Sequence, residues 1–125
     1  MLFRSNEFKT LIPTITRSSI IGTIVGVIPA AGAGVSSWIC YSLGKRFSKH
    51  PEKFGHGAME GIASSESGNN AATGGALVPL ITLGLPGSAV AAILLGGMLM
   101  HGLVPGANMF TENTHVTFEI GRAHV

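Results

Sequence analysis

The sequence predicts an all-α fold, namely a segment of a polytopic membrane protein whose transmembrane helices are broken by Gly and Pro. Three observations favour this class. Only 11% of the 125 residues are charged, against roughly 25% in an ordinary soluble domain. The mean hydropathy is +0.44. Two long stretches, residues 20–43 and 67–111, contain no Asp, Glu, Lys or Arg, and the first is long enough to cross a bilayer core.

The composition also excludes several other classes. An apolar share of 46% is far too high for a solvated coil, and the 18 glycines lack the three-residue period of collagen. The formal net charge of +2 is too small to indicate nucleic acid as a partner. Cys40 is the single cysteine, so an intrachain disulfide and a multi-thiolate metal site are both ruled out. The sequence has no Asp, which rules out proteases that use paired aspartates in the membrane.

Gly and Pro interrupt both uncharged stretches. Because Pro removes a helix hydrogen bond and Gly lets the chain turn, each interruption is a predicted helix break. The interruptions are 29–34, Pro79, 84–87 and 105–106. Residues 88–104 are predicted to form a helix at the short end of the length that spans a bilayer. The simpler alternative is a set of kinked helices that pack through small residues, as at 22–26 and 102–106.

Basic residues flank the first uncharged stretch on both sides. Residues 1–19 carry three basic and one acidic side chain, and residues 44–54 carry four basic and one acidic side chain. The positive-inside bias places both flanks in the cytoplasm. A re-entrant hairpin that turns at 29–34 satisfies this bias. A simple span, in which one basic cluster is overruled, is the alternative.

The most distinctive polar cluster is residues 64–75, at the start of the second uncharged stretch. Hydroxyl and carboxylate oxygens suit a hard cation such as Na⁺, and Glu66, Ser67 and Thr73 are the candidate ion ligands. Amide donors beside a helix N-terminus suit a carboxylate, which makes Asn69 and Asn70 candidate substrate ligands. The competing interpretation is a polar turn that caps a membrane helix.

The turn at 84–88 is the second candidate for binding a carboxylate. No Lys or Arg occurs between Lys53 and Arg122, so an anion in this region must use helix N-termini and neutral donors. The candidate residues are Gly84, Pro86, Gly87 and Ser88, with Pro29 and Gly32 of the other turn as a further wall. His101 is expected to be a packing histidine rather than a proton relay, and Glu60 and His56 are expected on a solvated face.

The residues leave two function classes open. Ser65-Glu66-Ser67-Gly68 partly matches the G-x-S-G of rhomboid-type intramembrane serine proteases, and Ser67 would then need His101 or His115 as its base. The other class is a non-transporting membrane scaffold. A dinucleotide-binding loop and a P-loop are both missing from the sequence.

Three motifs of the chain resemble the TctA family, the large membrane subunit of bacterial tripartite tricarboxylate transporters. They are Phe54-Gly-x-Gly-Ala-x-Glu-Gly-Ile-Ala63, Glu66-Ser-x-Asn-Asn-Ala-Ala-x-Gly-Gly-Ala-Leu-Val-Pro-Leu80 and Thr82-Leu-Gly-Leu-Pro-Gly-Ser88. Segments 22–29 and 101–106 fit the same pattern, and the resemblance covers about residues 18–113. Two positions depart from it: Ala30 stands where the family usually has Gly, and Ser65 where it usually has Pro.

The resemblance implies a multi-pass permease of the bacterial inner membrane that imports carboxylates with an ion gradient, expected to be Na⁺. It also implies two partners, a small membrane subunit and a periplasmic solute-binding protein. It implies no enzymatic activity, no catalytic residue, no resident metal and no cofactor.

Family members are several times longer, so the chain is expected to be an internal fragment. Residues 1–119 are assigned to the permease domain. Residues 120–125, Ile-Gly-Arg-Ala-His-Val, match a translated sequencing adaptor and are expected to be non-native.

Overall fold

A computed structural model describes the backbone of residues 5–112 and the side chains of residues 8–111; His115 and the 120–125 tail lie outside this range. All regular elements in the described range are helical, which confirms the all-α class. The elements are α1 (Ser5–Val27), α2 (Gly32–Phe47), the 3-10 helix η1 (Pro51–Lys53), α3 (Met59–Leu83), α4 (Ala89–Met100) and α5 (Met109–Glu112).

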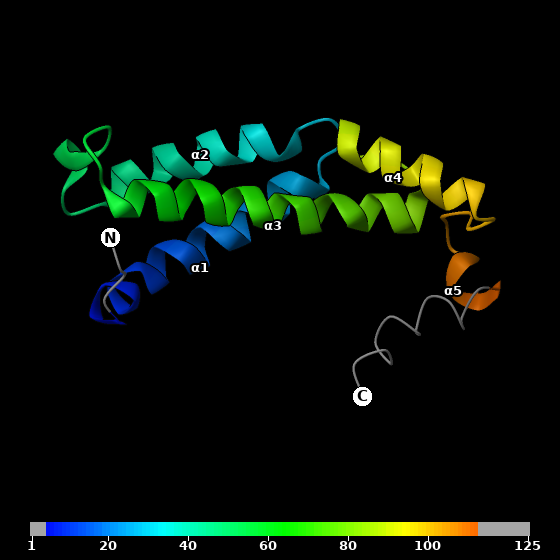
Figure 1. Ribbon diagram of the computed structural model, residues 1–125, viewed down its shortest axis with the longest axis horizontal. Helices are drawn as coiled ribbons and strands as arrows, with labels where there is room; N and C mark the ends of the chain where they lie inside the picture. The colour runs from blue at the N-terminus through cyan, green and yellow to red at the C-terminus, as the bar shows by residue number, and fades with distance from the viewer. Residues whose placement is uncertain (1–4, 113–125) are drawn as a thin grey trace.

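Helix α3 is the longest element and the others are arranged around it. Helices α1 and α2 form an antiparallel hairpin that packs against the first part of α3, and the α1–α3 interface is the most extensive in the fold. Helices α2 and α4 lie one after the other along the same side of α3 (Figure 1). The chain therefore has one continuous long helix beside two shorter ones.

Small residues explain how the three helices approach so closely. The buried positions of α3 recur every three or four residues and so lie along one face. A Cβ at Gly22 would overlap the carbonyl oxygen of Gly68, and a Cβ at Gly26 would overlap the backbone of Ala72. The predicted packing role of 22–26 is thus confirmed. The same expectation for 102–106 is wrong, because this segment is not helical and a Cβ at either glycine would meet no atom within 4 Å.

Two buried polar side chains of α2 contact backbone carbonyls of the neighbouring helices. The Ser36 hydroxyl donates to the carbonyl oxygen of Gly68 at 2.9 Å, and the Cys40 thiol lies 3.5 Å from that of Ser18. These contacts tie α2 to α3 and to α1. Since an unpaired buried donor is costly, these two side chains are accounted for by structure alone.

Three of the four predicted helix breaks are confirmed, including the one at 105–106, which lies outside the helices, and one is wrong. The chain turns at 28–31 between α1 and α2, and α3 ends before Gly84, whose φ of 68° is left-handed. Pro79, in contrast, lies inside α3 and is buried. The packing of residues on both sides of Pro79 holds the helix together despite the missing hydrogen bond. The helix predicted over 88–104 is shorter than expected, because α4 covers only Ala89–Met100.

The polar cluster at 64–75 lies in the middle of α3, so both the predicted turn and the helix N-terminus expected beside it are wrong. Its side chains are satisfied within the helix. The Asn70 amide donates to the carbonyl of Glu66 at 3.0 Å, and the Thr73 hydroxyl donates to that of Asn69 at 3.3 Å. Such local bonds let polar residues stay helical.

Within the described part of the chain, residues Phe8–Val27 of α1 form a helix long and apolar enough to cross a membrane, judged by length and composition. Helix α4 is equally apolar in character but shorter. The sequence predicted several membrane-spanning helices. A single candidate span among the described residues is weak evidence and does not confirm a polytopic membrane fold.

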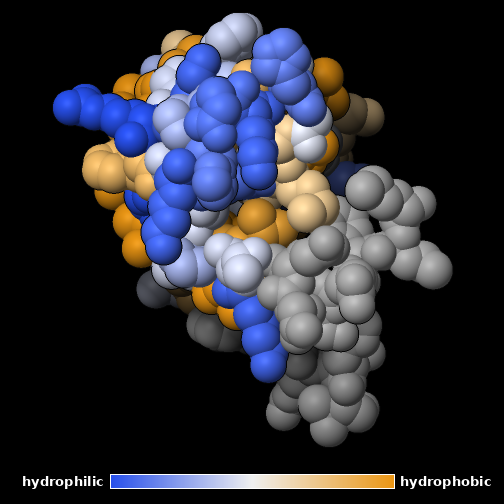
Figure 2. All heavy atoms as spheres, turned by 90° about the vertical axis from the view of Figure 1, so that its left-hand side faces the viewer, coloured by the Kyte–Doolittle hydropathy of each residue, from blue (hydrophilic) through white to orange (hydrophobic). Residues whose placement is uncertain are grey.

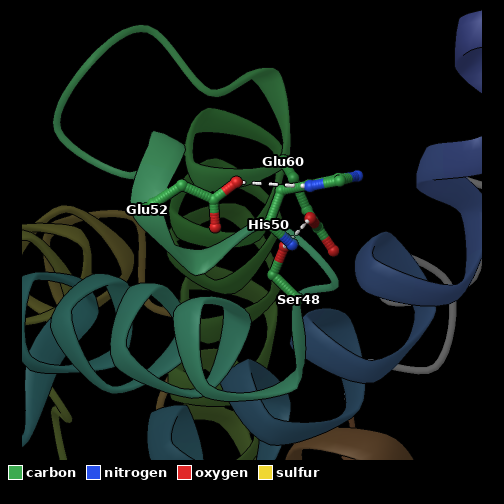
Figure 3. Close-up of polar contacts among 4 residues, drawn as sticks. All are labelled: Ser48, His50, Glu52 and Glu60. Carbon is green, nitrogen blue, oxygen red and sulfur yellow. Dashed lines mark hydrogen bonds and ion pairs between the residues drawn. The ribbon is translucent and has the colours of Figure 1, made fainter.

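A carboxylate joins three elements at the end where α1 begins and α2 ends. Glu60, in the first turn of α3, accepts a hydrogen bond from Thr14 of α1 at 3.0 Å and another from Ser48 after α2 at 2.5 Å. Figure 3 shows Ser48 and Glu60 in contact, and beside them the exposed pair of His50 and Glu52 at 3.3 Å. Glu60 is half-buried, so its expected solvated position is wrong, whereas His56 is exposed as expected.

Glu60→Ala is expected to destabilise the fold by about 1–3 kcal/mol, because the buried Thr14 hydroxyl loses its partner. Thermal unfolding of the purified chain in detergent measures this. Glu52→Ala removes the same charge from the exposed pair and should leave the unfolding midpoint unchanged. Equal midpoints for the two variants would show that the Glu60 contacts contribute nothing.

Candidate functional site

A cavity of about 480 Å³ lies where α2 and α4 both begin, against the middle of α3. Ala33 of the first turn of α2 lines one wall, and the first turn of α4 lines another. Thr73 and three apolar neighbours of α3 form the floor. The complete lining is Ala33, Ala72, Thr73, Ala76, Leu77, Ser88, Ala89, Val90, Ala91 and Leu94.

The segment 84–88 brings α4 back to this position after α3 has ended. Gly84 closes α3 in a left-handed conformation that favours glycine, and its N–H donates to the carbonyl of Leu80 at 3.0 Å. Gly87 then lies against α3, where a Cβ would be 3.2 Å from that of Ala76 and 3.3 Å from the carbonyl oxygen of Gly26. A glycine at position 87 therefore lets the returning backbone pack closely on α1 and α3.

The two helix N-termini at the cavity differ in how they are capped. The Ser88 hydroxyl accepts a hydrogen bond from the Ala91 N–H at 3.1 Å, which confirms that Ser88 opens the helix. At α2 the cap position is Ala31, which offers no side-chain acceptor. The N–H groups in the first turn of α2 are thus not satisfied by a capping side chain.

The electrostatics of the cavity follow from these ends. A helix N-terminus carries a partial charge of about +0.5. The N-termini of both α2 and α4 lie at this cavity. The lining has no charged side chain; its polar side chains are the hydroxyls of Thr73 and Ser88. Such a site can hold one anionic group, such as a carboxylate, through backbone N–H groups and the Ser88 hydroxyl, since the Thr73 hydroxyl already donates to Asn69.

The predicted substrate ligands are only partly brought together. Ser88 lines the cavity, and Gly32 directly precedes Ala33 in its wall. Pro29 lies in the exposed turn before α2. Gly84, Pro86 and Gly87 shape the return of the chain but do not line the cavity. Asn69 and Asn70 do not line it either.

The predicted ion ligands are also divided. Glu66 and Ser67 line a smaller groove of about 200 Å³ between α1 and α3, with Asn70 as a third polar residue. Thr73 lies in the larger cavity instead. Two sites lined mainly by apolar residues therefore occur along α3; the polar side chains of one include a carboxylate, and those of the other are hydroxyls only. No group of three or more His, Cys, Asp or Glu occurs within the described residues.

Several residues that line the cavity could not be found from the sequence. Ala33, Ala89 and Leu94 line the cavity but carry no chemical group that would mark them. Thr73 was marked as polar, but its assignment to the cavity depends on which face of α3 it occupies. The sequence indicated the location of the cavity only through the predicted helix breaks at 29–34 and 84–87, which precede α2 and α4.

The alternative of a serine hydrolase finds no support in the geometry. Ser67 lies in the first half of α3, whereas His101 follows the far end of α4, which points away from that half (Figure 1). His101 is also exposed, so its expected packing role is wrong.

Two discontinuous helices that begin at a shared cavity beside a continuous helix are typical of helical membrane transport proteins. Comparison with known proteins identifies the particular group. The chain belongs to the tripartite tricarboxylate transporter TctA family, whose profile matches residues 1–121. The resemblance predicted from the sequence is thereby confirmed.

Two relatives come from Agrobacterium vitis. The chain is 43% identical to an uncharacterized 52.8 kDa protein in the TAR-I ttuC′ 3′ region, over 85% of the chain and 21% of the relative. It is 43% identical to an uncharacterized protein in the TAR-II ttuC′ 3′ region, over 73% of the chain and 38% of the relative. The chain thus spans less than half the length of either relative. No solved structure matches it.

Proposed function

We propose that the chain is part of the permease subunit of an ion-coupled carboxylate uptake transporter. Membership of a tricarboxylate transporter family supports the general activity. The observation that carries the proposal is the uncharged cavity at which α2 and α4 both begin. A carboxylate in this cavity is stabilised without a buried Lys or Arg, which would be costly at membrane depth.

The lengths of the helices suggest how the chain sits in a multi-pass protein of the inner membrane. Helix α3 has 25 residues, about 37 Å, enough to cross a hydrocarbon core of about 30 Å. Helix α4 has only 12 residues, about 18 Å, and begins beside the middle of α3. Helix α2 has 16 residues, about 24 Å, too short to cross this core. We therefore propose that the α1–α2 hairpin is re-entrant and that the cavity lies near the bilayer midplane, where transporters bind substrate.

The charges give the orientation of this arrangement. Lys9 lies near the start of α1, and Lys45 and Arg46 lie in the last turn of α2, so both ends of the hairpin are basic. The positive-inside bias places this end in the cytoplasm. The hairpin turn at 28–31 then lies inside the membrane and next to the cavity.

The groove of Glu66, Ser67 and Asn70 is the proposed site of the coupling ion, Na⁺. Carboxylate, hydroxyl and amide oxygens are ligands that hard cations take. The ionised Glu66 side chain would be unfavourable in the membrane without a counter-charge, and a bound cation supplies one. Thr73 lines the other cavity and is therefore not part of the proposed ion site.

Two further subunits complete the proposed system: a small membrane subunit and a periplasmic solute-binding protein that delivers the carboxylate. The tripartite organisation of the family supports both.

Uptake of a labelled tricarboxylate tests the proposal, in cells that express the protein with the other two subunits of its system. We expect uptake to require Na⁺, and Glu66→Gln to raise the Na⁺ concentration for half-maximal uptake at least ten-fold. A lost charge-assisted contact of roughly 1.5–3 kcal/mol corresponds to roughly 10- to 150-fold in affinity. Glu52→Gln, the same change on the exposed loop, serves as control.

Each negative result has a defined meaning. Failure to take up any carboxylate would favour the scaffold alternative. Uptake that is equal in Na⁺ and in choline would overturn the ion assignment and leave the carboxylate site untouched.

A further inference from the structure

Figure 2 shows that the end of the molecule facing the viewer is mainly hydrophilic and is bordered by apolar side chains. Exposed Lys45, Arg46, Lys49 and Lys53 lie there, against Glu52, the single exposed acid of the loop between α2 and α3. Hydrogen bonding to the backbone lowers the pKa of Glu52, with a smaller contribution from His50. The net charge of this end stays positive with Glu52 ionised.

The loop is held in place rather than loosely attached. Phe54 is buried, and its ring makes an edge-to-face contact with Tyr41 of α2 at 5.4 Å between centroids. The backbone N–H of Phe54 donates to the carbonyl of Pro51, and that of Lys53 donates to the carbonyl of His50. Lys49 and Lys53 are therefore presented from a fixed backbone.

The outer face of α2 leads from apolar to basic residues toward this end. Val35, Trp38, Ser42 and Lys45 are spaced three or four residues apart, so they share one face of the helix, and all four are exposed. Trp38 is 74% exposed. A groove of about 300 Å³, lined by Ser37, Trp38, Tyr41 and Ser65, runs beside this row.

A contact between α1 and α2 lies at the same level as the change from apolar to basic residues on α2. The guanidinium of Arg17 lies 4.9 Å from the centroid of the Phe47 ring, and Phe47 is 62% exposed. Arginine at a helix surface reaches toward the polar edge of a membrane while its stem stays apolar. The row on α2 and this pair thus place the edge of the apolar zone at the last turn of α2.

We propose that the Trp38–Lys45 row of α2 and the basic loop bind an anionic phospholipid. One acyl chain lies along Val35, Trp38 and the groove, and the headgroup phosphate contacts Lys45 and Lys49. The order of the groups, apolar surface and then two basic side chains, matches acyl chain and then phosphate. An acidic face of a partner protein would match the charges but not the apolar row. The inference depends on the membrane location and not on carboxylate transport.

Trp38 is the only tryptophan of the chain, so its fluorescence reports directly on this face. The test places the full chain in nanodiscs of phosphatidylcholine containing phosphatidylglycerol, with the bromine label on one lipid or on the other. We expect brominated phosphatidylglycerol to quench Trp38 more strongly, at equal mole fraction, than brominated phosphatidylcholine. Since each basic residue near an anionic surface contributes about five-fold in affinity, Lys45→Gln should lower the preference by about five-fold.

Lys9→Gln removes the same charge from exposed α1 and is the matched control, expected to keep the preference. Equal quenching by the two brominated lipids, or an equal loss in both variants, would overturn the proposed site. Absence of quenching by either lipid would show that protein covers this face of α2, which also overturns it. Because quenching needs no transport, failure of the carboxylate proposal would leave the result unchanged.

Discussion

Replacing Gly75 by alanine is expected to destabilise the fold by about 1–3 kcal/mol, the usual cost of overpacking an interior. A Cβ at this position would overlap the carbonyl oxygen of Thr23 and lie 3.1 Å from the Cα of Gly26. Both neighbouring atoms belong to the backbone of α1, so they cannot move aside as a flexible side chain would. The α1–α3 interface would have to open along its length.

Gly74 provides the matched control, because it is the adjacent residue of the same helix and a Cβ there meets no atom within 4 Å. Gly74→Ala should be neutral or stabilise by up to about 1 kcal/mol, since alanine favours a helix over glycine. Thermal unfolding of both variants in detergent gives the comparison. A Gly75→Ala midpoint at or above that of Gly74→Ala would show that α1 and α3 are not packed this closely.

The contrast between these two glycines shows what the sequence could predict about the fold. The helical class followed from the long uncharged stretches, and the breaks at 29–34 and 84–87 followed from local Gly and Pro chemistry. Pro79 has the same local chemistry but lies inside α3, because packing on both sides outweighs one lost hydrogen bond. A single sequence cannot tell the two cases apart, since the difference lies in residues distant along the chain.

The turn predicted for the polar cluster at 64–75 is wrong for a related reason. Ser, Asn and Gly together are typical of turns, but in α3 one face of the cluster, with Ser64, Gly68 and Gly75, is buried against α1 and α2. Gly68, for example, receives the Ser36 hydroxyl on its carbonyl oxygen. Residues that permit close helix contact are the same residue types that permit a turn, so composition alone could not decide between them.

The sequence predicted where the candidate site lies better than it predicted which residues line it. Both turns that the sequence singled out lead into helices that begin at the cavity. The side chains assigned to it were the polar ones, however, and Asn69 and Asn70 lie elsewhere on α3. The first turns of α2 and α4 contribute backbone N–H groups, which belong to every residue type and leave no trace in the sequence.

Thr73 and Glu66 show how one helix can serve two sites. They are seven residues apart, about two turns, and line two separate cavities along α3. In the proposed transporter the substrate and the coupling ion would therefore be held by the same rigid helix. Any movement of α3 would then change both sites together, which is a direct physical route to coupling.

Ala33→Asp is expected to abolish carboxylate uptake while the protein stays folded. Ala33 is the second residue of α2 and lines the cavity wall. A carboxylate there would take the place of the substrate at the uncapped helix end and repel an incoming anion. Like charges at close range cost several kcal/mol, which corresponds to more than about 100-fold in affinity. Because a helix N-terminus favours acidic groups, it offsets part of the cost of this charge, and the variant is expected to stay folded.

Ala33→Asn separates charge from size, because the two side chains have nearly the same shape. We expect the asparagine variant to keep most of the uptake and the aspartate variant to lose it, at equal expression and with both variants shown to be folded by thermal unfolding. Equal loss in both variants would mean that space at Ala33, not charge, limits transport. Full uptake by Ala33→Asp would remove the N-terminus of α2 from the carboxylate site, because no anion could bind there beside a fixed carboxylate.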